Sequence, residues 1–203
     1  MFKPLVVVAF CLLVTACQVT TVSGLPFGDS GISDSSPRAS RPMTVGQRSL
    51  PPRGFVDFCS RNPAACAEVA VTSGPVRLTP ERWTELVEVN RTVNRSFTFA
   101  EDSATNGRKE YWDYPKDAGD CEDFALEKQR RLIAQGWPAN ALLITVANVP
   151  RIGGHAVLVV VTNSGDYVLD ILNSSVRSWH EVDYRWMKRQ SPRNPQAWQK
   201  VIV

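Results

Sequence analysis

The order of the secondary-structure signals along the chain limits the fold class more than any other feature of the sequence. Thr79-Pro80 is a good helix start, with Thr as the N-cap and Pro at the first helical position. A second helix is predicted from Asp120 to about Gln135, because Gly136 would end it. β-rich runs come only afterwards, at 141–149, 155–162 and 167–172, with a turn at 163–166. Helices followed by an antiparallel sheet predict an α+β fold.

The first 17 residues are predicted to be a signal peptide. Lys3 supplies the positive start, and Leu5 to Val14 is an almost purely apolar run. A membrane-spanning helix needs about twenty such residues, so this run is too short to be one. We therefore expect an exported protein that resides in the periplasm.

Cys17 follows the apolar run directly, and two cleavage patterns fit there. Val14-Thr15-Ala16-Cys17 resembles a lipobox, in which cleavage leaves Cys17 as a lipid-modified N-terminus. Val14 and Ala16 also fit the ordinary signal-peptidase pattern of small residues. The lipobox is preferred, because a Cys at this place is otherwise unneeded. A lipid on Cys17 would hold the protein at the outer membrane, and no other membrane attachment is expected.

The rest of the chain is interpreted as a tether and one domain. Residues 18–53 are predicted to be a flexible tether, because Ser, Gly, Pro and Arg dominate residues 22–53. Residues 54–203 are predicted to be the folded domain, a common size for one core. The net charge of +3 is too small to indicate a nucleic-acid partner.

The cysteines divide into a predicted pair and one free thiol. After export, Cys59, Cys66 and Cys121 remain in the domain, and two of three should pair in an oxidising compartment. Cys59 and Cys66 are the natural pair, and Asn62-Pro63 lets the chain bend between them. Two buried free thiols are the alternative. Cys121 is left unpaired, so it is either an inert buried residue or a nucleophile.

Cys121 is predicted to lie in the first turn of the second helix, where two effects on its pKa oppose each other. The free N–H groups of a helix N-terminus favour the thiolate and could hold an oxyanion. The acids Asp120, Glu122 and Asp123 flank the thiol and would raise its pKa. A histidinium or a bound cation would resolve this conflict.

Only two histidines are available as a base for Cys121. His155 follows Gly153-Gly154 at the start of a predicted strand, and His180 lies in the polar tail. A histidine at a strand start is more often structural. The scarcity of histidine and the free cysteine nevertheless favour a Cys121–His155 pair, with His180 as the weaker alternative.

Two residues compete to orient the imidazole. Asp170 is an acid within an apolar strand and should have a partner. A three-residue hairpin loop with Gly165 in the left-handed conformation would pair Thr162 with Asp166, which places Asn173 opposite His155. A bulge or a longer loop would restore Asp170. The residues alone leave both open.

Several spaced motifs together resemble a known family. Glu110-Tyr111-Trp112, Gly119 to Leu126, Gly154 to Leu158 and Gly165 to Asp170 are similar to the bacterial transglutaminase-like cysteine proteinases, as is the segment around Cys59, Pro63 and Cys66. The resemblance covers residues 54–179. It implies a papain-like or transglutaminase-like fold with a triad of Cys121 as nucleophile, His155 as base and acid, and Asp170 as orienting residue. Many relatives have Asn where this chain has Ile171.

The resemblance also implies a cation and partners. Adhesin-cleaving relatives bind calcium at acids beside the nucleophile, and Asp120 and Glu122 match those positions. Hard carboxylates suit Ca²⁺, although an acid cluster that only complements the helix dipole is the alternative. Zinc is disfavoured, because one free Cys and two distant His do not form a four-ligand set. The implied partners are a protein substrate, such as a surface adhesin, and an inner-membrane regulator.

The leading hypothesis is an exported cysteine peptidase that forms an acyl-enzyme on Cys121. One alternative is a transamidase or amidase with the same triad, because transfer of the acyl group to water or to an amine needs the same residues. A second alternative is a calcium-responsive envelope binding module without catalysis.

Overall fold

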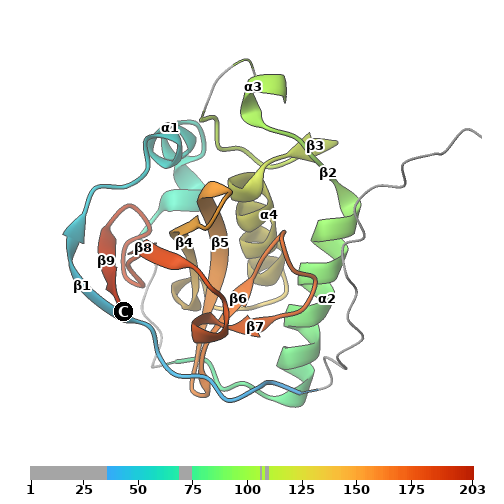
Figure 1. Cartoon of the computed structure of the whole chain (residues 1–203), viewed down its shortest axis with the longest axis vertical. Coiled ribbons are helices and arrows are strands. Elements are labelled where there is room, and N and C mark those ends of the chain that lie inside the picture. The colour runs from blue at the N-terminus through green and yellow to red at the C-terminus, as the bar shows by residue number, and fades with distance from the viewer. Residues whose placement is uncertain (1–35, 69–74, 106, 108–109) are drawn as a thin grey trace, which may run out of the picture. The chain divides into compact units, whose positions relative to one another are not determined.

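One antiparallel sheet organises the computed structural model, which describes residues 36–68, 75–105, 107 and 110–203 (Figure 1). The sheet has seven strands in the order β1-β9-β8-β4-β5-β6-β7. The central pair, β4 and β5, is fully in register along the whole of β4. The strands are β1 (Thr44–Ser49), β4 (Leu142–Val149), β5 (Gly153–Thr162), β6 (Gly165–Leu169), β7 (Arg177–Ser178), β8 (Arg185–Gln190) and β9 (Trp198–Ile202). The predicted α+β fold class is confirmed.

Helices cover one face of this sheet. The longest is α2 (Pro80–Ser96), where Thr79 caps the helix as predicted by accepting a hydrogen bond from the N–H of Arg82. Beside it α4 (Cys121–Ala134) packs against β5, and both helices contribute to the larger apolar core. From the sheet, the even-numbered residues of β5, from Ala156 to Val160, enter the same core. The remaining helices are α1 (Arg53–Arg61), α3 (Asp102–Thr105) and the short 3-10 helices η1 (Pro63–Cys66), η2 (Ala139–Ala141) and η3 (Trp179–Glu181).

A second, smaller core lies on the opposite face. Val157 and Val159 of β5 and Val168 of β6 point to this face, because side chains alternate along a strand. Two tryptophans, Trp179 and Trp186, cover them. His155 and Asp170 share the parity of these residues, so both belong to this face of the sheet.

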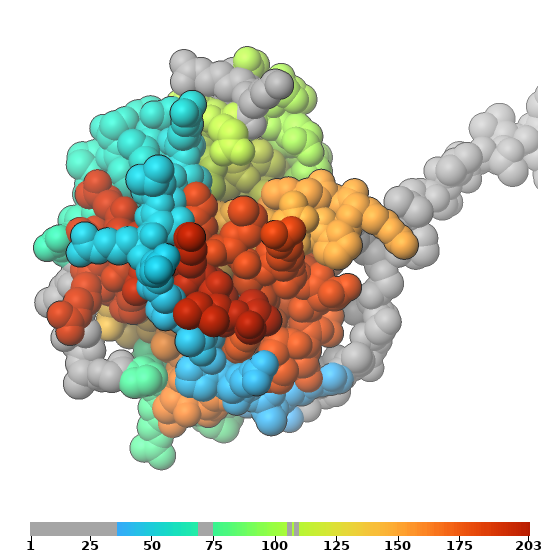
Figure 2. Space-filling view, turned by 60° about the vertical axis from the view of Figure 1, so that its left-hand side comes forward, coloured from blue at the N-terminus to red at the C-terminus, as the bar shows by residue number. Residues whose placement is uncertain are grey.

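The domain begins earlier than predicted. Residues 36–53 were expected to be part of a flexible tether, but β1 pairs with β9 and Met43 is 4% exposed in the smaller core. Figure 2 shows this blue-to-cyan segment running across the C-terminal strands. The Ser, Gly, Pro and Arg content of this segment did not indicate that it is folded, because backbone groups help to attach the segment to the domain. The N–H of Met43 donates to Asp166 at 2.9 Å, and the indole of Trp179 donates to the carbonyl of Arg41 at 2.7 Å.

Two other segments gain structure that the sequence did not predict. The stretch 98–117 contains α3 and a two-residue strand, β2 (Thr98–Phe99), that pairs in parallel with β3 (Ala118–Gly119). The tail from Trp179 contains η3 and two strands, β8 and β9. These two strands join the sheet between β4 and β1. Alternation of polar and apolar residues is weak in β8 because a bulge interrupts its pairing with β4 between Val146 and Ala147.

The predicted disulfide is present. Cys59 and Cys66 are bonded with their Cα atoms 5.6 Å apart, and the chain bends at Asn62 between α1 and η1. The predicted signal peptide and the predicted lipidation site, Cys17, lie outside the described residues. Within the described ranges, no helix has the length and apolar character needed to cross a bilayer.

Candidate active site

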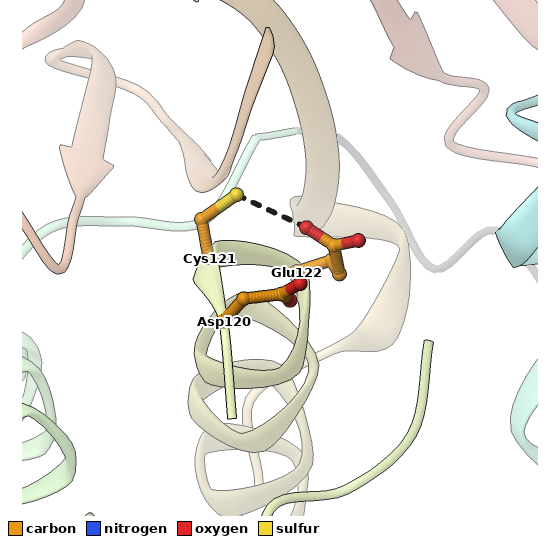
Figure 3. Close-up of side chains that lie close together, drawn as sticks. All are labelled: Asp120, Cys121 and Glu122. Atoms are coloured by element: carbon orange, nitrogen blue, oxygen red, sulfur yellow. Dashed lines mark hydrogen bonds between the residues drawn. The ribbon is translucent and has the colours of Figure 1, made fainter. Parts of the chain in front are cut away.

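Cys121 is the first residue of α4 and the one free cysteine among the described residues (Figure 3). Asp120 occupies the N-cap position, as predicted, but its side chain makes no capping hydrogen bond. The first N–H groups of a helix have no partner inside the helix, so those of this turn are available to a bound group.

The sulfur of Cys121 has two polar contacts. The thiol donates to Oε2 of Glu122 at 3.0 Å, as Figure 3 shows. The N–H of Ala156, in β5, donates to the sulfur at 3.3 Å. Since Ala156 follows His155 directly, the second contact brings the nucleophile candidate to the backbone beside the candidate base.

His155 is held by Asp170. Nε2 of the imidazole lies 2.7 Å from Oδ1 of Asp170, and the side chains of both residues are 3% exposed. Nδ1 makes no hydrogen bond within the described part of the chain. A neutral imidazole that donates from Nε2 leaves Nδ1 as an acceptor, which is the state that a general base requires.

The register of the β5–β6 hairpin explains why Asp170 reaches His155. The three-residue loop that would pair Thr162 with Asp166 is not formed, and the loop is shorter rather than longer: Thr162 pairs with Gly165, and Leu158 pairs with Leu169. A shift of one residue moves every side chain of a strand to the other face. Asp170 thereby joins the face of His155 as its diagonal neighbour, within side-chain reach.

Asn173 and His180, the alternatives from the sequence, take other roles. The side chain of Asn173 accepts from the N–H of Ser175, and its carbonyl accepts from the amide of Asn90 in α2. Nδ1 of His180 lies 2.9 Å from the hydroxyl of Ser178. Neither residue contacts the Cys121–His155–Asp170 group in the described structure.

Tyr184 completes the site and was missed by the sequence analysis. Its hydroxyl donates to Oδ2 of Asp170 at 2.5 Å, and its ring meets that of His155 edge-on at 5.8 Å. Burial of Asp170 alone would raise its pKa. The hydrogen bond and charge of His155, the Tyr184 hydroxyl and the charge of Lys128 outweigh burial, so the pKa of Asp170 is lowered.

The thiol of Cys121 is held in its protonated form. Burial raises its pKa well above the ordinary value, and the charge and hydrogen bond of Glu122 raise it further, while the N–H of Ala156 lowers it. Glu122 is itself crowded, since burial and the charge of Asp120 raise its pKa to about 9. Of the two opposing effects expected at this helix start, burial and the acids therefore prevail over the helix terminus.

Buried acids form two overlapping groups at the start of α4. Asp120 lies with Cys121 and Glu122 in one group and with Asp102 and Asp123 in the other, and in each group the candidate ligand atoms are within 4.8 Å of one another. Burial and the neighbouring acids raise the pKa of Asp120 to about 6, and burial raises that of Asp123 to about 7. Asp102, in α3, was not singled out in the sequence, because only the fold brings it to α4.

With this geometry in hand, the chain can be compared with known proteins. The family model for bacterial transglutaminase-like cysteine proteinases matches residues 45–202. The chain belongs to this family. Membership agrees with the α+β fold and with a free cysteine at a helix N-terminus beside a His–Asp pair. The match also begins within β1, which agrees with the earlier start of the domain.

Solved structures of one protein, LapG, are similar to part of this chain. Legionella pneumophila LapG, in its calcium-bound and EGTA-treated forms, is 30% identical to this chain, with a TM-score of 0.46. The likeness covers 52% of this chain and 63% of the calcium-bound LapG chain, so it spans less than two thirds of LapG. A search of curated proteins found no match.

Proposed function

We propose that this chain is an exported cysteine peptidase that cleaves a cell-envelope or surface protein, such as an adhesin. Cys121 is the nucleophile, His155 the general base and acid, and Asp170 the residue that orients His155. One observation carries the proposal: the sulfur of Cys121 is hydrogen-bonded at 3.3 Å to the residue after His155, and His155 is hydrogen-bonded at 2.7 Å to Asp170.

Acylation follows from the roles of these three residues. Nδ1 of His155 takes the thiol proton as the sulfur attacks the carbonyl carbon of the scissile peptide bond. The oxyanion that forms is stabilised by N–H groups at the start of α4, which have no helical partners. His155 then gives its proton to the leaving nitrogen, and the C–N bond breaks to leave a thioester on Cys121.

Deacylation uses the same residues in the reverse order. His155 takes a proton from water as the water oxygen attacks the thioester carbon. The C–S bond breaks, the acid product leaves, and the proton returns to the sulfur. Asp170 stays ionised throughout and stabilises the imidazolium, which agrees with its lowered pKa.

The acids at the start of α4 fit a calcium ion. Oδ1 of Asp120 is buried without a hydrogen-bond partner, and hard carboxylate oxygens are the ligands that Ca²⁺ prefers. The group Asp102, Asp120 and Asp123 consists of carboxylates alone, whereas the group with Glu122 includes a soft sulfur. We assign the ion to the all-carboxylate group, and Glu122 stays beside the thiol. A bound cation would supply positive charge that favours the ionised acids and the thiolate.

The calcium assignment is tested by binding and labelling. Calcium titrated into the full chain after EGTA dialysis should raise the melting temperature and speed iodoacetamide labelling of Cys121. Asp102→Asn should remove both effects, whereas Asp57→Asn, at an exposed site on α1, should leave them. Equal responses in both variants would remove Asp102 from the ligand set.

Export and lipid attachment are tested by fractionation. Cys17→Ser should release the protein from the membrane fraction of the producing bacterium into the periplasm. An unchanged distribution would refute the lipid anchor while leaving the peptidase proposal intact.

Catalysis is tested with intact envelope proteins as substrates. The full chain is incubated with a solubilised envelope fraction, and new N-termini are identified by mass spectrometry, with Cys121→Ala and Asp57→Asn in parallel. We expect new N-termini with the wild type and Asp57→Asn and at least about a thousandfold fewer with Cys121→Ala. Products that carry an added amine instead of a free acid would indicate transamidation. Equal products from wild type and Cys121→Ala would refute catalysis by this thiol.

A further inference from the structure

A basic pocket lies beside the first residues of β8, where Trp186 of the smaller core and Lys188 both line it. It has a volume of about 470 Å³ and opens between the ends of β1, β4, β8 and β9. Its lining residues are Ser49, Asn148, Arg185, Trp186, Met187, Lys188 and Lys200. Three cations and no acid line it, and none of the three cations forms an ion pair within the described residues. The mechanism above uses none of these residues.

Strand register connects this pocket with the nucleophile. Ala156, which contacts the sulfur of Cys121, pairs with Val146, Val146 pairs with Lys188, and Lys188 pairs with Lys200. Directly opposite residues in antiparallel strands point to the same face. Lys188 and Lys200 therefore project from the sheet on the side of Cys121, along one row that crosses four strands.

A second row of paired residues runs beside the first. It begins at Gly154, on the other side of His155 from Ala156. Gly154 pairs with Asn148, and Asn148 pairs with Arg185. A Cβ atom added to Gly154 would have no atom within 4 Å, so the space above this row is open next to His155. The two rows start at the residues that flank His155 and end in the basic pocket.

We infer that this pocket is a subsite for acidic side chains of the peptide substrate, on one side of the scissile bond. The inference rests on the proposed peptidase function. Arg185 and Lys200 are exposed and can meet a carboxylate in solvent, whereas Lys188 is half-buried and donates to the carbonyl of Leu50 at 2.9 Å. Burial lowers the pKa of Lys188 despite the charge of Glu110, so Arg185 and Lys200 carry most of the recognition.

The sheet spacing fixes where in the substrate the acids belong. Neighbouring strands lie about 4.8 Å apart, so β8 is about 10 Å and β9 about 14 Å from Ala156 in β5. An extended peptide advances about 3.3 Å per residue. Acidic residues should therefore be enriched about three to four positions from the cleaved bond.

The first arm of the test measures binding without catalysis. The probe is a fluorescein-labelled decapeptide with four Asp and Glu residues, and a matched peptide carries Asn and Gln instead. With the Cys121→Ala chain, the acidic peptide should bind at least threefold more tightly at low salt, and the difference should shrink as salt screens it. Arg185→Gln combined with Lys200→Gln should weaken acidic binding about three- to tenfold.

The control is Arg193→Gln, which removes one exposed cation from the β8–β9 loop at the far end of these strands. It should leave binding of the acidic peptide unchanged. Equal binding of the two peptides, or equal weakening by Arg193→Gln and the double variant, would overturn the inference.

The second arm reads the cleavage preference from a peptide library prepared from a whole proteome. Wild type should show acids enriched three to four positions from the cut on one side, and the double variant should lose this enrichment while it still cleaves. Cleavage without any acidic preference would overturn the subsite but leave the peptidase function standing. Absence of cleavage would overturn the function, and the binding arm would then decide alone whether the pocket takes acidic peptides.

Discussion

A cysteine at a helix N-terminus usually has a lowered pKa, and Cys121 departs from this because of its neighbours. Glu122 accepts a hydrogen bond from the thiol at 3.0 Å, its charge disfavours a thiolate beside it, and burial removes the water that would stabilise a thiolate. The N–H of Ala156 works in the opposite direction but does not offset them. Ionisation of this residue therefore depends on a change in the charges around it.

Glu122→Gln tests this view of the thiol. Glu122 carries most of its negative charge only above its pKa of about 9, so the variant should differ from the wild type chiefly in that range. There the pKa of Cys121 should be lower without the carboxylate, and we expect iodoacetamide labelling at pH 10 to become about tenfold faster, which corresponds to about one pKa unit. Glu88→Gln, on the exposed side of α2, should label like the wild type. A slower or equal rate in Glu122→Gln would contradict the role assigned to this carboxyl.

Tyr184→Phe tests the support of Asp170 and its pH dependence. The hydroxyl bonds a charged group, so its loss should lower the free energy of unfolding at pH 7 by about 1.5–3 kcal/mol. The pKa of Asp170 is lowered in the folded protein, so this stabilisation is complete above the ordinary value of 3.8 and is lost as the pH falls through the folded pKa. Urea unfolding at several pH values should show the gap between wild type and variant closing in acid. A gap that widens in acid would contradict the assignment.

Turnover of the Tyr184→Phe variant should also fall about tenfold, if about 1.4 kcal/mol of this support acts in the transition state.

At the scale of elements, the β5–β6 hairpin determines which acid meets His155. Local residues predicted both strands and the turn between them, but not the number of residues in the turn. Gly165 has a positive φ of +105°, which glycine adopts readily, and a glycine by itself does not select the register. The pairing of Thr162 with Gly165 is settled by packing, because it directs Leu169 into one core and Val168 into the other.

Gly165→Ala tests the attachment of the N-terminal segment to this hairpin. A Cβ atom at Gly165 would lie 2.5 Å from the backbone of Ser40 and Arg41, in addition to the strain of the positive φ. We expect a loss of about 2–4 kcal/mol in the free energy of unfolding, measured with urea.

Gly136→Ala is the matched control for that experiment. Gly136 also has a positive φ, of +87°, but nothing lies within 4 Å of its added Cβ. It should cost only about 1 kcal/mol for the backbone alone. Equal losses in the two variants would show that the contact with Ser40 and Arg41 adds nothing.

The sequence predicted the elements with strong local signals and missed those that depend on distant partners. The Thr79-Pro80 helix start, the helix that begins at Cys121 and the Cys59–Cys66 bond are found as expected. Tyr184 and Asp102 could not be assigned to the site, because each reaches it from a segment without helical or strand periodicity. The resemblance to a family, rather than spacing, selected Asp170 over Asn173.

For the whole molecule, the most informative correction is the start of the domain. Residues 36–53 supply an edge strand and a buried Met43, and the hydroxyl of Ser40 donates to the carbonyl of Asp166 at 2.7 Å. Buried Asp166 also accepts from Arg189 at 2.7 Å, so this segment helps to cover an ion pair.

Two truncations test this boundary. A chain of residues 36–203 should melt close to the chain lacking only the signal peptide, whereas residues 54–203 should melt at least about 10 °C lower, because several kcal/mol of strand pairing and burial are lost. Circular dichroism and calorimetry measure both. A stable fragment of residues 54–203 would contradict the contribution assigned to β1.

The protonated, covered state of Cys121 has a consequence for the lifetime of the protein in the oxidising compartment that we propose for it. Oxidants such as peroxide, and disulfides in exchange reactions, react with thiolates and not with thiols. A sulfur that is held protonated against Glu122 reacts slowly with both. The contact with Glu122 thus preserves the proposed nucleophile, and the disulfide of Cys59 and Cys66 leaves no other thiol in the described domain to attack it.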